Sequence, residues 1–573
     1  MLWKFQNILA KCSSLNNDNG PVSAGHFLHK GGEFMRKVVG IENELRADVG
    51  NSKSQKRFED FDIPALIVGK AAYVQEAILN PQDDDPDSFT CKKINESVKM
   101  HESKGDPRHR SVRSIVEEHI NRDEEQDLEP EGLNTMYRRR FGLSGGYSRS
   151  GFRVYLDGTH PEICTPECLT PYDIVSWDKA GEIIIDKARE EAEKQIGNKI
   201  TVYKNNSDGF GHSWGTHENY FVENILFDLL TKNYHLERPT LASEIWKTFI
   251  VTRFIYCGSG KVGAEHLCKP EARNKFLLSQ RAEFFECDLG IQTTHHRPLI
   301  NTRDEPYTSF EYENKGKRLH VIIGDANMSE VATYLKTGMA MLLLNALECR
   351  GGLFLGHKLP ILVNPLSALG EISLDTGCKK ELKVYHRGDI KFMTAIDIQG
   401  VFCEELRAIN YINHQDAPWA QDVISLMEDV LFDLKEDPFN LVGVLDWPTK
   451  LALMEEFLDD NKLDWSRVKA DSDVFSKMKG LDTAYHRLDD KGIYNQLLTQ
   501  GMFRRITDSA TVEGCCVNPP QNTRAKIRGE IIKANTGNIA YINWHYAELV
   551  NPRRMVFFSD PCEPEITKER SRK

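Results

Sequence analysis

The sequence predicts an α+β fold built around an antiparallel β-sheet. Segments with apolar side chains at every second position, such as residues 35–45 and 152–157, have the period of a half-buried strand. Glycine and asparagine separate these segments, and no regular helix follows each one, as a parallel sheet would require. Helical spacing of apolar residues is concentrated mainly beyond Ser329. The helical ranges we expect are 177–196, 329–348, 417–434 and 448–458.

Length and composition allow a large core with a smaller appendage. The chain has 573 residues, of which 40% are hydrophobic, so global disorder is excluded. The formal net charge of −12 argues against a nucleic-acid coat or an anionic-membrane binder, because both need a positive field. No apolar run approaches the roughly 20 residues of a membrane helix, and no signal peptide is recognisable, so we expect a cytoplasmic protein. The 13 cysteines lack metal-ligand spacing and are interpreted as reduced thiols.

The first strand-like segment, residues 35–45, carries an acidic face. Val39 and Ile41 point to one side of this strand, whereas Glu42 and Glu44 point to the other. The carboxylates are therefore available for a binding site on the face opposite the core.

Two stretches of the N-terminal part predict mobility. Residues 1–34 are polar and rich in Gly, Asn and Ser, which is typical of a flexible extension. Residues 80–149 contain the charged runs DDDPD, HRSVR, DEEQDLEPE and RRR, with few apolar anchors between them. This composition indicates a long mobile insertion.

A second strand, FRVYLD at residues 152–157, brings further polar side chains to one face. Its alternation directs Arg153, Tyr155 and Asp157 away from the core, and Glu162 follows five positions after Asp157. Carboxylates that meet on one sheet repel one another unless cations lie between them. Such hard oxygen ligands suit Mg2+ with nucleotide phosphates. The structural alternative for each acid is a solvated sheet face or a salt bridge.

Several later motifs have both a binding interpretation and a purely structural one. The segment YKNNSDGFGHSWGTHENY is compatible with contacts to phosphates or a peptide, and equally with a turn-rich hairpin whose Asn and Asp satisfy their own backbone. Arg281 and Arg303 could each clamp a phosphoryl group or serve as structural ion-pair partners. GSGKVGAE at residues 258–265 is interpreted as a turn, because Lys261 lacks the following Ser or Thr of a phosphate loop. Residues 491–573, with the strand candidates NIAYINWHYAEL and RRMVFFSDP, predict a small separate domain.

These motifs together resemble the glutamine-synthetase-like family of Pup ligases and Pup deamidase/depupylases, also called proteasome accessory factors. The resemblance rests on GIENE, RVYLDGTHPE with TPE, YKNN with GTHENY, SQRAEF, INTRDEP, LHVIIGDAN and DPFNLVGVLDWPTKL. It implies a large catalytic domain at residues 35–490, in which a curved antiparallel sheet packed by helices cradles ATP or ADP and Mg2+. It also implies a small C-terminal α/β domain at residues 491–573.

The resemblance implies roles for individual residues as well. Asp157 occupies the position of the family's catalytic aspartate. Metal contacts are implied for Glu42, Glu44, Tyr155, Glu162, His217 and His320. Nucleotide contacts are implied for Arg153, Thr165, Arg281, Arg303 and Trp544. Asn43 replaces the Thr or Val expected within GIENE, but both acids of that motif remain.

The activity implied by this resemblance is ATP- and Mg2+-dependent processing of Pup, with pupylated proteins and the proteasome system as partners. The insertion, ECDLGIQTT and GDAN resemble the depupylase branch, so we expect cleavage of the isopeptide bond between Pup and a substrate lysine, or deamidation of the Pup C-terminal glutamine. NTRAKIRGEIIKA and INWHYAELVNPRRMVFFSDP resemble the ligase branch. The alternatives are therefore a Pup–protein ligase acting through a glutamyl phosphate, an amide ligase for another peptide tag, or a non-catalytic binding module.

Overall fold

The computed structural model describes most of the chain outside the predicted extension and insertion. The described ranges are 37–49, 62–75, 78–79, 146–232, 239–265, 272–303, 316–348, 358–412, 418–470, 472–535 and 537–571. The predicted extension at residues 1–34 lies outside these ranges, as does the predicted insertion up to residue 145. The last part of the insertion range contains a short strand, Gly146–Tyr147.

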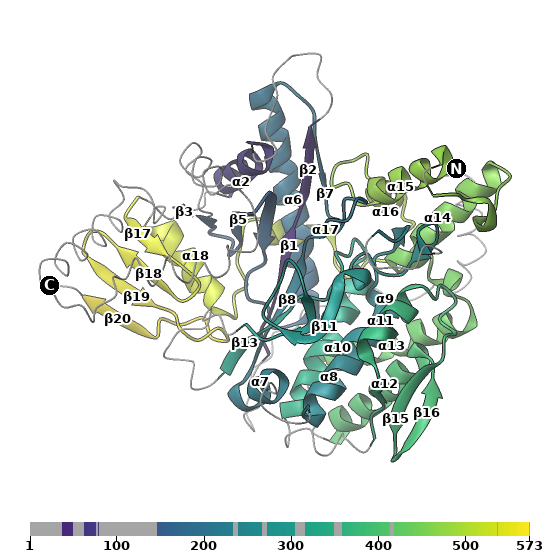
Figure 1. Cartoon of the computed structure of the whole chain (residues 1–573). Coiled ribbons are helices and arrows are strands. Elements are labelled where there is room, and N and C mark those ends of the chain that lie inside the picture. Colours follow the sequence, from purple (N-terminus) through teal and green to yellow (C-terminus); the bar gives the residue numbers. More distant parts are fainter. Residues whose placement is uncertain are drawn as a thin grey trace, which may run out of the picture.

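A seven-stranded antiparallel sheet runs through the middle of the molecule (Figure 1). Its strands, in spatial order, are β13 (Gly316–Val321), β8 (Thr216–Glu223), β1 (Val39–Glu44), β6 (His160–Cys164), β5 (Arg153–Asp157), β4 (Gly146–Tyr147) and β3 (Ile78–Leu79). The two strands expected from alternation become β1 and β5, and β6 lies between them. The predicted α+β class is confirmed, because every neighbouring pair in this sheet is antiparallel.

Helix α6 (Pro171–Ile196) packs on the central sheet together with α2 (Asp62–Val74), which the sequence analysis missed. Thr170 caps the start of α6 by accepting a hydrogen bond from the Asp173 amide at 3.0 Å, and Pro171 fits the first helical turn. Gly197 ends the helix at φ 71°, a conformation that glycine adopts without steric cost. The helix therefore ends where its sequence predicts but begins six residues earlier.

Most of the described residues between 224 and 485 form a largely helical layer, which extends over the lower centre and the right-hand side of Figure 1. Its helices are α7 (Asn224–Thr231), α8 (Leu241–Thr252), α9 (Phe254–Cys257), α10 (Glu330–Glu348), α11 (Pro365–Ser373), α12 (Ala395–Ile412), α13 (Pro418–Glu436), α14 (Asp446–Asp460) and α15 (Asp473–Tyr485). Helices α10, α13 and α14 correspond to the three ranges predicted beyond residue 329. Helix α10 is buried over most of its length, so it joins this layer to the sheet.

Small sheets complete the large domain. They are β2 (Arg46–Val49) with β7 (Ile200–Tyr203), β9 (Lys261–Val262) with β10 (Phe276–Leu277), β11 (Phe285–Gly290) with β12 (Arg297–Asn301), and β14 (Ile361–Leu362) with β15 (Leu382–His386) and β16 (Asp389–Met393). The β11–β12 pair is parallel and departs from the antiparallel expectation. Lys261 of β9 is buried and forms an ion pair with Glu283. In the sequence, β9 lies between Gly260 and Gly263, and both of these glycines have a positive φ.

The small C-terminal unit has its own core. Helix α18 (Arg524–Ala534) packs on one face of an antiparallel sheet, and the strands of this sheet are β17 (Ile539–Ile542), β18 (Tyr546–Leu549), β19 (Arg554–Phe557) and β20 (Lys568–Ser571). Two preceding helices, α16 (Ile493–Thr499) and α17 (Ser509–Cys515), pack instead into the core around α6. By its packing the unit therefore begins near Thr523, later than the predicted boundary at residue 491.

The described part of the chain contains neither a membrane-spanning helix nor a disulfide bond. None of its helices combines the length and the hydrophobicity needed to cross a bilayer. Its cysteines are free thiols, as their spacing predicts.

Candidate active site

A cavity of about 290 Å³ opens between the exposed face of the central sheet and the C-terminal unit. Strands β1, β5, β6, β8 and β13 supply its floor, and Arg524, Trp544 and Pro561 supply the wall from the C-terminal unit. The predicted site residues that line it are Glu42, Arg153, Tyr155, Asp157, Glu162, Thr165, His217, Arg303, His320 and Trp544. The structure thus brings ten of the twelve predicted residues to one cavity.

The antiparallel register explains why residues from distant segments meet there. Side chains opposite each other on neighbouring strands share a face of the sheet. One row across β8, β1, β6 and β5 consists of His217, Glu42, Cys164 and Arg153. The adjacent row across β1, β6 and β5 consists of Glu44, Glu162 and Tyr155. A shift of one residue in any strand would turn its side chains away from the cavity.

Three carboxylates form the acidic centre of the site. One oxygen from each of Glu44, Asp157 and Glu162 lies within 4.8 Å of the other two. Withdrawal from water and the neighbouring Glu44 raise the pKa of Asp157 to about 6. Burial, with Glu42 and Glu44 close by, raises the pKa of Glu162 well above its usual range. The cluster therefore holds negative charge only at an electrostatic cost, which a divalent cation would remove.

A second group combines one carboxylate with two imidazoles. Glu42 Oε2 lies 3.5 Å from His217 Nδ1 and 3.8 Å from His320 Nε2. Burial opposes ionisation of Glu42, but the hydrogen bond from His217 and the charge of Arg318 outweigh it, so its pKa lies well below the usual range. Burial and Arg318 lower the pKa of His320 well below its usual range, which keeps the imidazole neutral.

The donor set fits bound divalent cations. Carboxylate oxygens are the ligands that Mg2+ prefers, and a neutral imidazole can also coordinate a metal. Both ring nitrogens of His320 are buried, and neither has a hydrogen-bond partner among the described residues. A buried polar atom without a partner is costly unless a ligand completes it. Glu44, Asp157 and Glu162 could hold one cation, and Glu42, His217 and His320 a second.

Arginines surround the two groups. Arg153 lies over the Tyr155 ring at 4.0 Å, and Arg303 donates to the Ile291 carbonyl at 2.9 Å while lining the cavity. Arg318, which sequence reasoning missed, lies 3.5 Å from Glu42. The sequence could have predicted this position of Arg318, since the alternation in KRLHV places Arg318 on the same face of the strand as His320. These side chains can bind the oxygens of a phosphate or a polarised carbonyl.

Two of the residues predicted to contact a nucleotide, Arg281 and Thr165, use their side chains for hydrogen bonds to the backbone of the protein itself. Arg281 is fully buried and donates to the carbonyls of Ile322 and Gly324, so it does not line the cavity. Burial and the nearby Arg297 lower its pKa to about 9. Thr165 lines the cavity, but its hydroxyl accepts the Ile41 amide at 3.0 Å and so ties β1 to the end of β6.

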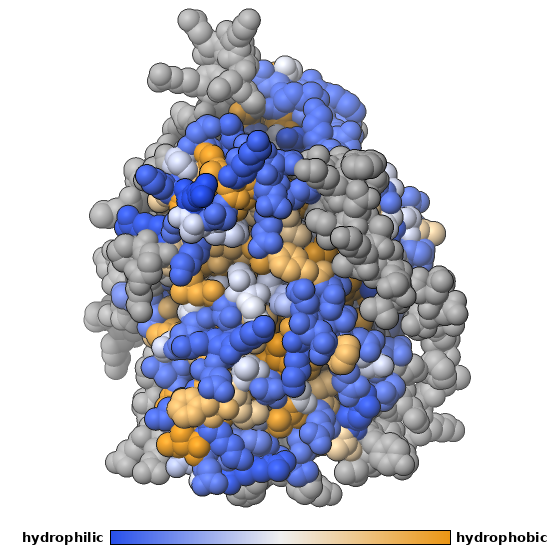
Figure 2. All heavy atoms as spheres, turned by 90° about the vertical axis from the view of Figure 1, so that its right-hand side faces the viewer, coloured by the Kyte–Doolittle hydropathy of each residue, from blue (hydrophilic) through white to orange (hydrophobic). Residues whose placement is uncertain are grey.

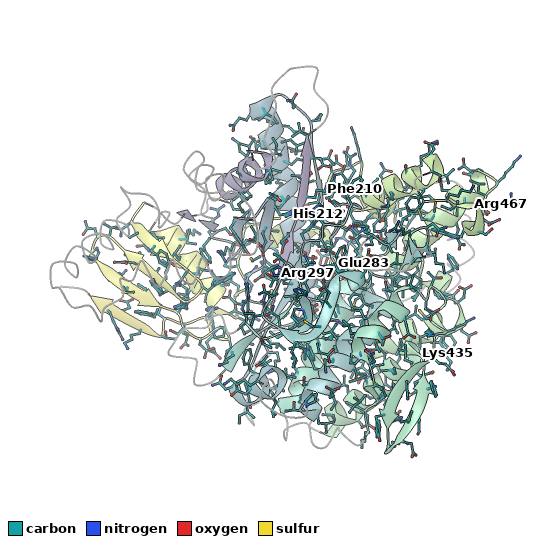
Figure 3. The ribbon with its side chains drawn as sticks, viewed as in Figure 1. Phe210, His212, Glu283, Arg297, Lys435 and Arg467 are labelled. Carbon is teal, nitrogen blue, oxygen red and sulfur yellow. The ribbon has the colours of Figure 1, made fainter. Side chains whose placement is uncertain are left out.

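Hydrogen bonds define the conformation of the glycine-rich segment before β8. Asp208 accepts hydrogen bonds from the Phe210 and His212 amides at 2.7 and 3.1 Å, as a turn-rich hairpin would require. Arg297, labelled below these two residues in Figure 3, donates to the Ser213 carbonyl at 2.7 Å. The turn interpretation therefore holds for this segment, whereas His217 beyond it faces the cavity.

A buried ion-pair cluster joins the C-terminal unit to the cavity wall. Glu167, in the TPE motif, accepts from Arg524 Nε at 2.6 Å and from Arg528 Nη2 at 2.6 Å. Burial opposes ionisation of Glu167, but the two arginines lower its pKa to about 2. Arg528 also donates to the Trp544 carbonyl at 3.2 Å and lies over the indole ring at 4.8 Å. Trp544 is thus positioned by a carboxylate of the large domain.

Glu167→Gln is expected to lower the free energy of unfolding by about 3 kcal/mol, because it leaves buried arginine charge without its counter-charge. The measurement is urea unfolding, followed by tryptophan fluorescence. The matched control is Glu569→Gln, which removes the partner of Arg554 in an exposed pair at 3.3 Å and should change stability by less than about 1 kcal/mol. Equal effects of the two substitutions would contradict this account of the cluster.

The fold can be compared with solved structures. The structure of the Pup ligase PafA in complex with ADP has a TM-score of 0.63 and 27% identity, covering 77% of this chain and 92% of that chain. The complex between the prokaryotic ubiquitin-like protein Pup and its ligase PafA has a TM-score of 0.67 and 24% identity, covering 93% and 90%. The antiparallel sheet with helices packed on it therefore defines a glutamine-synthetase-like protein.

The family model described as Pup-ligase protein matches residues 37–548, and the chain belongs to this family. A depupylase of Acidothermus cellulolyticus is 37% identical, over 70% of this chain and 75% of the relative. A Pup deamidase/depupylase of Mycolicibacterium smegmatis is 36% identical, over 69% and 73%. A Pup–protein ligase of Rhodococcus erythropolis is 35% identical, over 73% and 87%. Relatives with both kinds of name therefore lie at similar identity.

Proposed function

We propose that this chain is a nucleotide- and Mg2+-dependent depupylase, which releases Pup from substrate lysines or deamidates its C-terminal glutamine. The observation that carries the proposal is the carboxylate of Asp157, with a pKa raised to about 6, at the edge of a cavity that also gathers two candidate cation groups and several arginines. The names of relatives at 36–37% identity support Pup as the substrate. The structure of PafA in complex with ADP supports nucleotide binding by this chain.

In this proposal the chain's own residues act on one amide bond. In one form of the step, Asp157 takes a proton from a water that attacks the carbonyl carbon, and this proton passes to the departing lysine amine as the C–N bond breaks, which leaves a free carboxyl group on Pup. In the other form, the Asp157 carboxylate attacks the carbonyl carbon, the lysine amine leaves with a proton taken from solvent, and water then hydrolyses the acyl intermediate between Asp157 and Pup. A raised pKa suits the task, because a more basic carboxylate accepts a proton more readily while it is still ionised at neutral pH. Arg153, which lines the cavity, would stabilise negative charge on the carbonyl oxygen. Divalent cations, when bound, would supply further charge stabilisation for phosphates and the carbonyl oxygen.

Ligation is the second candidate function. Its support is the 87% coverage of a 35% identical Pup–protein ligase, against 75% coverage of the 37% identical depupylase. In that reaction the Pup carboxylate would first accept the γ-phosphoryl group of ATP, and a lysine amine would then displace phosphate. Asp157 would act there as the base that removes the lysine proton.

One experiment separates the two activities. The purified chain is offered a Pup conjugate in one reaction, and free Pup with an acceptor protein in another, each with and without ATP or ADP. Release of Pup without stoichiometric nucleotide consumption supports the depupylase. Formation of conjugate with one ADP per bond establishes the ligase instead. Turnover of neither substrate, in preparations that bind nucleotide, would overturn both proposals in favour of another peptide tag.

Binding of Mg2+ should depend on pH. An acid whose pKa is raised by folding contributes stability below its unfolded pKa, and this contribution is lost as the pH rises through the raised value. The cation-free protein therefore loses stability between about pH 4 and pH 6 through Asp157, and at higher pH through Glu162. We expect Mg2+ at 100 times its Kd to restore about 2.7 kcal/mol at pH 7.5, but much less at pH 5, where protons compete.

The measurement is thermal unfolding with and without MgCl2 at the two pH values. Glu162→Gln should reduce the Mg2+-dependent stabilisation at pH 7.5. Glu371→Gln, which removes an exposed acid paired with Lys380 at 3.2 Å, serves as the control and should leave it unchanged. Equal stabilisation of the wild type at pH 5 and pH 7.5 would show that these carboxylates do not bind the cation.

A further inference from the structure

The small sheet β14–β15–β16 has one buried and one exposed face. Leu362, Leu382, Val384 and His386 point into the core of the helical layer. The register aligns two rows on the opposite side: Ile361, Tyr385 and Ile390 in one, and Lys383 and Phe392 in the other. Val363 extends the second row, because its amide donates to the Lys383 carbonyl at 3.0 Å. We call these six residues the hairpin face.

Large apolar side chains are unusually open to solvent on the hairpin face. Phe392 is 62% exposed, Tyr385 54%, Ile390 51% and Val363 49%. Single exposed apolar residues are common on proteins, whereas a contiguous group in register marks an interaction surface. The view of this side of the molecule shows apolar, orange atoms gathered low on the surface among hydrophilic ones (Figure 2).

The charge around the hairpin face differs from that of the whole chain. Residues 379–391 contain five basic side chains and two acidic ones, in a protein whose formal charge is −12. Lys383 lies between Val363 and Phe392, inside the apolar rows. An ammonium group in that position favours a partner that brings a carboxylate into an otherwise apolar contact.

We propose that the hairpin face docks an acidic amphipathic helix of a partner protein. Three strands about 4.8 Å apart span about 10 Å, which matches the width of one helix. The apolar stripe of such a helix would cover Tyr385, Ile390 and Phe392, and a Glu or Asp within the stripe would pair with Lys383. None of the six residues lines the cavity, so this docking is separate from the proposed catalysis.

The probes are synthetic helical peptides of about 18 residues, since shorter helices are marginal in water. The first has a leucine stripe with one central glutamate and acidic flanks. The second has the same composition in an order that breaks the stripe, and the third carries lysine in place of the central glutamate. Binding of each fluorescein-labelled peptide to the full-length chain is measured by fluorescence anisotropy.

The first peptide should bind at least tenfold more tightly than the second. Tyr385→Ser with Phe392→Ser should remove this preference, whereas Lys383→Glu should shift it toward the third peptide. Phe432→Ser, at a single exposed phenylalanine of α13 (65% exposed), is the matched control and should bind like the wild type. Because all these positions are exposed, circular dichroism should show the same fold for each variant.

Three results would overturn the proposal. Equal affinity for the first and second peptides would show that no helical stripe is recognised. Equal loss of binding in Phe432→Ser would place the contact elsewhere. A concentration-dependent dimer in sedimentation, abolished by Phe392→Ser, would show that a second copy of the chain occupies the face.

Discussion

Asp157→Asn should reduce the turnover of a Pup conjugate by about 10²- to 10⁴-fold, the range contributed by a positioned acid or base. The amide cannot accept a proton or attack a carbonyl, but it has nearly the shape of the carboxylate. The substitution also replaces one of three neighbouring carboxyl groups by a neutral amide. The cation-free variant should therefore be at least as stable as the wild type at pH 7.5, because the repulsion that raises the pKa of Asp157 is relieved.

The measurements are kcat with a fluorescent Pup conjugate, nucleotide affinity by calorimetry, and thermal unfolding. Asp429→Asn, at an exposed position of α13, is the control for loss of a surface carboxylate and should leave kcat unchanged. A variant that loses activity together with stability and nucleotide binding would point to a structural role for Asp157. A variant that retains wild-type kcat would exclude it from the chemistry.

Gly215→Ala should also disable the site, by a steric route. A Cβ atom at this position would lie 2.1 Å from His217 Nε2 and 2.6 Å from Glu44 Oε1, so both side chains must move. The backbone cannot easily yield, because the Gly215 carbonyl accepts the Glu44 amide at 3.1 Å. We expect a loss of about 100-fold or more in kcat, since a displacement of about 1 Å of catalytic groups has that effect.

The same measurements report this loss, with the addition of Mg2+ affinity, which should fall with kcat. Gly400→Ala in α12 is the matched control, since a Cβ atom there meets nothing within 4 Å and alanine favours a helix. Unchanged Mg2+ affinity in Gly215→Ala would show that neither the group with Glu44 nor the group with His217 holds a cation.

Local periodicity was sufficient to predict two of the five strands that form the floor of the cavity, β1 and β5. Alternation in GIENE and FRVYLD places Glu42 and Asp157 on exposed faces because a strand directs its side chains to alternate sides. Gly197, a residue type that stops helices, likewise predicted the end of α6 at Ile196. These features depend on interactions within a few residues, so the sequence carries them directly.

Long-range packing accounts for what sequence reasoning missed. The partner of Glu167 is Arg528, 361 positions away, and no local pattern connects the two. Arg281 occurs in a motif beside the site, yet its guanidinium turns inward to satisfy backbone carbonyls. The parallel pairing of β11 with β12 and the placement of α16 and α17 in the large core also depend on tertiary contacts.

Tyr147 of β4 bears on how freely the C-terminal unit could be exchanged between proteins. This side chain belongs to the hydrophobic core of that unit and packs edge-on against Trp544 at 5.3 Å, although it lies about 380 positions before α18 begins. A residue of the central sheet thus completes the hydrophobic core of the C-terminal unit. Recombination that moved residues 523–571 alone would carry an incomplete core, so inheritance should keep both parts of this chain together.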